Sequence, residues 1–147
     1  MTQTIDTLFI NAIVLTMDEK LTQYDPGAVA VNGDSIVAVG SEAELKKEYS
    51  AKEVVDCGGK ILMPGLVNAH THVPMTLVRG LADDLRLDVW LMGYMLPVER
   101  QFVSPEFVRL GTLIACAEQI RSGVTTFNAM YSYEDDIAQA TADAGMR

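Results

Sequence analysis

Two histidines, His70 and His72, flank Thr71, and they are the only histidines in the 147-residue chain. Side chains at positions i and i+2 of a β-strand point to the same face, so two imidazoles spaced in this way could converge on one metal ion. Imidazole nitrogen is a common ligand of zinc and other transition metals. A lone His-x-His pair is also frequent by chance, and exposed loop histidines are the ordinary alternative. The elements around the pair must therefore decide between these interpretations.

Those elements follow a strand–helix–strand–helix order. A short apolar strand, 66–70, follows the turn at Pro64-Gly65 and is expected to be buried on both faces. Ser104-Pro105 begins a helix that Gly123 ends, and a strand over 124–129 and a helix over 134–144 follow. The apolar stripe expected to bury the first helix consists of Phe107, Leu110, Leu113, Ile114, Ala117 and Ile120.

This order predicts parallel βα units, whose functional groups gather at the carboxyl ends of the strands. The histidine pair lies at that end of its strand. A full (β/α)₈ barrel takes roughly 250 residues, so two units are too few to close one. We therefore expect an α/β chain that holds the start of a TIM barrel, is an incomplete fragment, and needs the remaining barrel strands.

The first sixty residues indicate short strands instead. Apolar, β-branched runs over 8–16, 28–31 and 36–39 predict a sheet, and Asn32-Gly33 between the last two predicts a tight hairpin. Ser41 to Glu44 resembles a capping box that opens a short helix ending near Tyr49. Further strands are expected at 54–56 and 60–63, on either side of Gly58-Gly59.

Composition limits the class of protein. Apolar residues make up 49% of the chain and charged residues 21%, which favours a globular domain over a disordered segment. A net charge of −9 argues against nucleic-acid and anionic-membrane surfaces, because both need clustered positive charge. Cys57 and Cys116 match no metal or redox motif, and no secretory signal or membrane span is visible, so a cytoplasmic location is expected.

The run MPGLVNAHTH, from Met63 to His72, resembles the first-strand signature of the amidohydrolase superfamily. The preceding β-rich segment resembles that family's small β-sandwich. The resemblance implies two parts, an N-terminal segment of the sandwich over 1–62 and the first two βα units of a metal-dependent hydrolase barrel over 63–147. It implies that His70 and His72 bind one divalent metal ion, zinc or alternatively iron, together with ligands on later strands.

Three shorter runs narrow the resemblance: PMTLVRG at 74–80, DVWL at 88–91 and LPVE at 96–99. They resemble the 5-methylthioadenosine/S-adenosylhomocysteine deaminases and their chlorohydrolase relatives. In the deaminases, the residue matching Glu99 binds the ribose hydroxyls and the residue matching Trp90 lines the substrate pocket. Without the resemblance, Glu99 would be read as a solvated carboxylate and Trp90 as a packing aromatic.

The resemblance thus implies an aminohydrolase in which a metal-activated hydroxide deaminates the adenine ring of a purine nucleoside. The general acid and base of the family lie on later strands, so no catalytic residue is expected in this chain, and the chain alone is expected to be inactive. Two alternatives stay open: a guanine or triazine hydrolase of the same superfamily, and a relative that keeps the fold without catalysis. Metal identity, exact substrate and homo-oligomerisation are not decided by the sequence.

Overall fold

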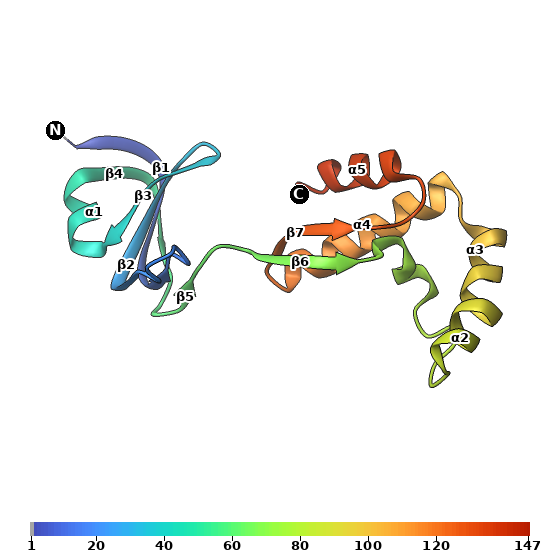
Figure 1. Ribbon diagram of the computed structural model, residues 1–147. Coiled ribbons are helices and arrows are strands. Elements are labelled where there is room, and N and C mark those ends of the chain that lie inside the picture. The colour runs from blue at the N-terminus through green and yellow to red at the C-terminus, as the bar shows by residue number, and fades with distance from the viewer. Residues whose placement is uncertain (1) are drawn as a thin grey trace. The chain divides into compact units, whose positions relative to one another are not determined.

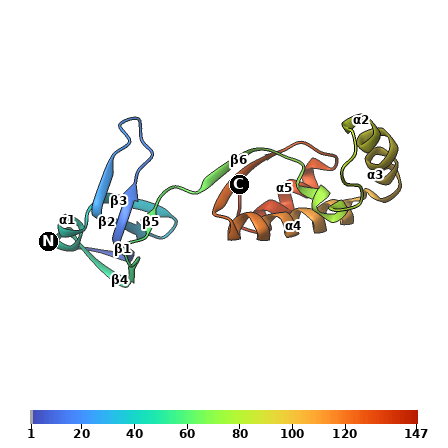
Figure 2. The same cartoon turned by 90° about the horizontal axis from the view of Figure 1, so that it is seen from below.

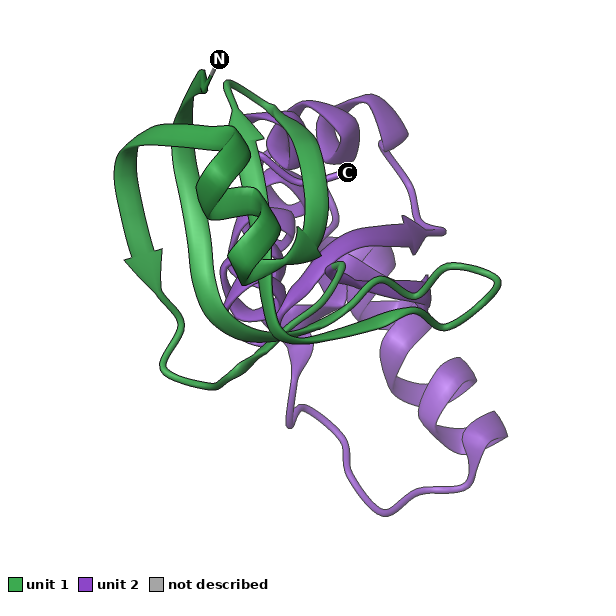
Figure 3. Ribbon diagram, turned by 90° about the vertical axis from the view of Figure 1, so that its left-hand side faces the viewer, with its two compact units in different colours: residues 1–64 green, residues 65–147 purple. Residues whose placement is uncertain are grey.

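The computed structural model describes residues 2–147. The chain forms two compact units, residues 1–64 and residues 65–147, which Figure 3 shows in separate colours. The sequence places a boundary two residues earlier, between residues 62 and 63. The assignment of the first unit to a β-sandwich and of the second to a barrel stays a prediction.

The N-terminal unit is a five-stranded mixed sheet with one helix (Figure 1). Its elements are β1 (Gln3–Leu15), β2 (Gln23–Asn32), β3 (Ser35–Ser41), α1 (Glu42–Glu48), β4 (Tyr49–Asp56) and β5 (Ile61–Leu62). The strand order is β3-β2-β1-β4, and the short β5 pairs with β1 beyond β4. Strand β2 is antiparallel to both neighbours, whereas β4 and β5 run parallel to β1.

The predicted hairpin is confirmed between β2 and β3. Asn32 pairs with Ser35, which leaves Gly33 and Asp34 as a two-residue loop. Gly33 has a φ of 62°, and positive φ at the first central position alone is the pattern of a type II′ turn. The predicted helix also begins after Ser41, but the capping box does not form. The Ser41 hydroxyl donates to Glu44 Oε2 at 2.6 Å and caps no backbone N–H group.

Helix α1 has seven residues, too few to be stable without tertiary contacts. Its Leu45 is buried against the sheet, in a cluster with Ile5, Leu8, Ala28 and Ala30. Burying a leucine contributes roughly 1.5–3 kcal/mol, which is more than helix propensity alone could give so short an element.

The C-terminal unit contains the expected parallel βα pattern. Its elements are β6 (Leu66–Thr71), the 3₁₀ turn η1 (Val73–Val78), α2 (Leu87–Trp90), the π-helical turn η2 (Leu91–Met95), α3 (Leu96–Phe102), α4 (Pro105–Arg121), β7 (Val124–Ala129) and α5 (Glu134–Asp143). Strands β6 and β7 pair in parallel. Figures 1 and 2 show α4 running alongside this pair, with α2 and α3 beyond the carboxyl end of β6.

The predicted ends of α4 are confirmed. The Ser104 hydroxyl accepts a hydrogen bond from the backbone N–H of Phe107 at 3.2 Å, and Pro105 occupies the first turn. Gly123 follows the helix with a φ of 77°, a conformation that favours glycine.

The predicted buried face of α4 is wrong. Leu110 and Ile120 are 54% and 51% exposed, and Ile114 is exposed as well. The helix instead buries Val108, Gly111, Thr112, Ala115 and Cys116. These smaller residues let η1 and α5 approach the helix axis closely, so close packing selects a face that apolar periodicity does not mark.

The expectation that β6 is buried on both faces is also wrong. Leu66 and Val67 are 51% and 66% exposed. Among residues 2–147, β6 pairs with β7 alone, so the other edge of this two-stranded sheet has no neighbouring strand. Strands of a parallel sheet are normally covered on both faces, and these side chains are apolar enough for such an environment.

Helix α4 fixes η1, and η1 follows directly after His72. A Cβ atom placed on Gly111 would lie 2.5 Å from the carbonyl oxygen of Pro74, so only glycine allows this approach. The Thr76 hydroxyl lies 2.9 Å from the Gly111 carbonyl oxygen and 3.0 Å from the Val73 carbonyl oxygen, and it can donate a hydrogen bond to either. This contact sets where the chain goes after the second histidine.

Candidate metal and substrate site

The structure brings His70 and His72 together at the carboxyl end of β6. Their ring centroids are 5.2 Å apart and the ring planes meet at 83°. His70 lies within the strand and is exposed, whereas His72 is the residue before η1 and is partly buried. The i, i+2 spacing thus produces the adjacency that it predicts. Metal binding by the pair stays a prediction.

A backbone carbonyl fixes the orientation of one of the two rings. Nδ1 of His72 lies 2.6 Å from the carbonyl oxygen of Met130. Because that oxygen can only accept, we assign the proton to Nδ1, which leaves Nε2 with a free lone pair. The Met130 N–H in turn donates to the Thr71 carbonyl oxygen at 3.2 Å, which ties the segment after β7 to the end of β6. Histidines that bind metals commonly donate their other ring N–H in this way.

The two rings border a cavity of about 100 Å³ that Ala69, Thr71, Asn128 and Met130 complete. A water molecule takes up roughly 30 Å³ of liquid, so the space suits an ion with a few small ligands. No group of three or more His, Cys, Asp and Glu side chains comes together among residues 2–147. The described part of the chain therefore offers two imidazole ligands, one or two fewer than the three or four of a zinc site.

Glu99 lies on α3 and is partly buried. Its Oε1 accepts a hydrogen bond from the Tyr131 hydroxyl at 2.8 Å. Both side chains line a cavity of about 360 Å³, together with Leu96, Arg100, Val103, Ser132 and Tyr133. The structure thus brings Glu99 to the loop that follows β7, the same loop that holds His72.

Trp90 ends α2 and is partly buried. It lines neither the cavity beside the histidines nor the cavity beside Glu99. Of the residues expected to contact substrate, the structure therefore connects Glu99, but not Trp90, to the loop that holds the histidine pair.

Sequence reasoning missed Met130 and Tyr131. Burial raises the pKa of the Tyr131 phenol, and the hydrogen bond to the Glu99 carboxylate raises it further, so the phenol keeps its proton at neutral pH and acts as a donor. One signal was available: both residues directly follow the strand predicted over 124–129, at the carboxyl end where the functional groups of parallel strands gather.

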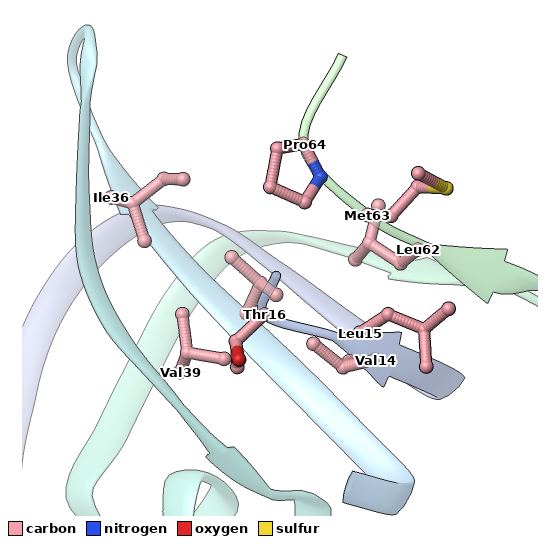
Figure 4. A pocket seen from close by; sticks show the side chains of 9 residues that line it. Val14, Leu15, Thr16, Ile36, Val39, Leu62, Met63 and Pro64 are labelled. Atoms are coloured by element: carbon pink, nitrogen blue, oxygen red, sulfur yellow. The ribbon is translucent and has the colours of Figure 1, made fainter. Parts of the chain in front are cut away.

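A separate cavity, of about 170 Å³, lies within the N-terminal unit (Figure 4). Its walls are mainly the aliphatic side chains of Val14, Ile36, Val39 and Leu62, and Thr16 is the one residue of its lining with a polar side chain. None of the residues that line this cavity is a His, Cys, Asp, Glu, Lys or Tyr, the side chains that usually act as acid or base in proteins.

A model described as the amidohydrolase family matches residues 61–147, and a bacterial imidazolonepropionase-like composite domain matches residues 27–49. The first match covers more than half of the chain, so this chain belongs to the amidohydrolase family. In agreement, the fold is an α/β arrangement like that of solved members. No helix among residues 2–147 has the length and apolar character needed to cross a membrane.

Among individual relatives, the chain is 46% identical over 145 residues to 5-methylthioadenosine/S-adenosylhomocysteine deaminase 1 of Syntrophus aciditrophicus, covering 99% of this chain and 33% of the relative. The crystal structure of an adenosine deaminase from Xanthomonas campestris, with bound zinc, superposes with a TM-score of 0.95 at 40% identity, covering 100% of this chain and 34% of that one. The crystal structure of an atrazine chlorohydrolase from Arthrobacter aurescens, complexed with zinc, superposes with a TM-score of 0.82 at 23% identity, covering 96% of this chain and 34% of that one. At this identity the likeness is one of fold alone. The chain spans about a third of the length of the relatives it matches.

Proposed function

We propose that the complete protein containing this chain is a metal-dependent deaminase that removes the adenine amino group of 5-methylthioadenosine, S-adenosylhomocysteine or a closely related nucleoside. One observation carries the proposal: His70 and His72 lie side by side at a strand end, with the Nε2 lone pair of His72 left free. The likeness to deaminases at 40–46% identity supports the choice of reaction.

The residues present fit one divalent cation, zinc or alternatively iron. Two imidazole nitrogens are suitable donors, the Met130 carbonyl fixes one tautomer, and the cavity beside them has room for an ion. When bound, such a cation supplies the Lewis acidity that makes water nucleophilic at neutral pH. The additional ligands and the general acid and base would come from residues outside this chain.

We assign β6, α4, β7 and α5 to the first two βα units of a (β/α)₈ barrel, and the N-terminal sheet to part of a small β-sandwich. The parallel pairing of β6 with β7 supports the first assignment. So does the exposure of Leu66 and Val67, because further barrel strands would cover apolar side chains of this kind. In such a barrel the histidines lie on the catalytic face.

Glu99 is the group that we assign to the ribose hydroxyls. A carboxylate accepts hydrogen bonds only, and its two oxygens suit the donation of two adjacent hydroxyls. Tyr131 occupies one site on Oε1, which leaves Oε2 and the second lone pair of Oε1 for a ligand. A triazine has no ribose, so Glu99 favours the nucleoside over a triazine. The role of Trp90 as a pocket wall rests on the resemblance alone.

Purified complete protein is expected to release ammonia from 5-methylthioadenosine or S-adenosylhomocysteine, measured by a coupled ammonia assay. The same preparation is assayed with guanine and with a chlorinated triazine. Turnover of either of these without turnover of any adenosine derivative would contradict the proposed substrate class and favour one of the other hydrolases.

Substituting Glu99→Gln is expected to weaken nucleoside binding about tenfold to a hundredfold, because hydrogen bonds to charged groups contribute about 1.5–3 kcal/mol. Binding of the free adenine base should change little, since the base has no ribose. Glu53→Gln, on an exposed position of β4, makes the same change of charge and serves as control. Equal losses for nucleoside and base would remove the ribose role.

A further inference from the structure

We propose that Tyr131 is a positioning residue for the Glu99 carboxylate, and that it thereby sets the preference of the site for ligands that carry two adjacent hydroxyls. The inference rests on the proposed function of Glu99 and adds to it a residue with no direct role in binding or chemistry. It follows from the contacts that hold Tyr131 on one side and Glu99 on the other.

The first step is the contact itself. The Tyr131 hydroxyl donates to Glu99 Oε1 at 2.8 Å, and no other hydrogen bond or ion pair engages the Glu99 side chain within residues 2–147. A glutamate side chain has three rotatable bonds, and fixing long side chains costs up to about 2 kcal/mol of conformational entropy. The tyrosine removes part of this freedom before a ligand arrives.

The second step is the rigidity of Tyr131. Its ring packs against the buried cluster of Val73, Val108, Ala115 and Ile137, and its backbone N–H donates to Glu134 Oε1 at 3.2 Å. Packing against the core holds the ring, and the hydrogen bond to Glu134 holds the backbone, so the position of the hydroxyl oxygen is fixed. Tyr131 is therefore a fixed donor to which the carboxylate on α3 adjusts.

The third step links the two parts of the site. Met130 precedes Tyr131, and its carbonyl oxygen accepts from Nδ1 of His72. Of these two consecutive residues, Met130 contacts His72 and Tyr131 contacts the carboxylate of Glu99 on α3. This short segment fixes the carboxylate relative to the histidines, which a bound nucleoside requires because its base and ribose are rigidly joined.

The experiment compares Tyr131→Phe with the wild type in the complete, metal-loaded protein. The probes are adenosine and 2′,3′-dideoxyadenosine, and the measured quantity is the ratio of their kcat/KM values. Loss of one hydrogen bond predicts a roughly three- to tenfold fall in this ratio, through KM with kcat retained. Tyr94→Phe is the control, because Tyr94 is exposed and its hydroxyl makes no hydrogen bond within residues 2–147.

A merely structural tyrosine would lower the thermal midpoint and affect both nucleosides equally, which would overturn the proposal. In a Glu99→Gln background, Tyr131→Phe should cause little further change in the ratio, and independent, additive effects would likewise overturn it. If Tyr131→Phe is unstable, the same comparison is made with Tyr131→Leu, which also lacks the hydroxyl and keeps an apolar side chain against the buried cluster.

Failure of the proposed function has a different signature. Wild-type protein that releases ammonia from neither probe, and from neither 5-methylthioadenosine nor S-adenosylhomocysteine, contradicts the deaminase assignment and leaves kcat/KM undefined. Equilibrium binding of the same two nucleosides then decides the role of Tyr131, with the same three- to tenfold change in their affinity ratio expected for Tyr131→Phe. An unchanged affinity ratio overturns it.

Discussion

Alanine at either His70 or His72 is expected to abolish metal binding and ammonia release together in the complete protein. The cavity beside the two rings offers no other His, Cys, Asp or Glu side chain within residues 2–147, so neither loss can be compensated locally. Replacing a residue that merely supports a metal ligand typically lowers metal affinity or activity 10- to 100-fold. Replacing a ligand itself should lower metal affinity more than about 100-fold. Metal content by elemental analysis and ammonia release are measured on the same samples.

His70→Cys is the informative companion variant. A thiolate is itself a zinc ligand, so this variant should retain more metal than His70→Ala while distorting the site. Thermal unfolding of all variants without metal separates ligand loss from misfolding. Stoichiometric metal retained by both alanine variants would show that the pair does not bind it, and the assignment of the site would fail with that result.

Local features of the fold could be predicted because each depends on neighbouring residues. Gly33 supplies a positive φ where the hairpin turns, and Ser104 accepts from the N–H group three residues later. The adjacency of His70 and His72 needs only a strand of known period. In each of these, the partners lie within three positions of one another.

Other features depend on partners that local pattern does not encode. Glu99 and Tyr131 are 32 positions apart, and His72 and Met130 are 58 apart, so neither contact has a periodic signature. Periodicity assigned the larger apolar residues of α4 to the core, whereas the helix buries its smaller ones. Trp90 illustrates the converse, since a family motif marks the residue but does not place its side chain beside either polar cavity.

Gly111→Ala tests whether close packing of α4 positions the metal pair, and it should destabilise the protein. Alanine normally gains about 1 kcal/mol over glycine inside a helix. Here the new Cβ would lie 2.5 Å from the oxygen and 2.8 Å from the Cα of Pro74, both backbone atoms of a buried residue that no rotamer change can move. Overpacking of this kind costs about 1–3 kcal/mol, occasionally more. Because the clash is with backbone atoms we expect the upper end of that range, which leaves a net loss of about 2 kcal/mol in the free energy of unfolding after the gain of about 1 kcal/mol.

The same displacement should reach the histidines, because Pro74 lies two residues after His72 and Gly111 directs the path of η1. We therefore expect the zinc affinity of folded Gly111→Ala protein to fall about tenfold, as measured by competition with a chelator. We also expect its denaturation midpoint to be lower than that of the wild type. Gly93→Ala is the matched control: nothing lies within 4 Å of its added Cβ and its φ is not positive, so it should be neutral or slightly stabilising. If Gly111→Ala protein were as stable as Gly93→Ala protein, η1 would have moved away from the added Cβ at no cost. If Gly111→Ala protein were destabilised but kept the zinc affinity of the wild type, the two histidines would be positioned by β6 and Met130 alone.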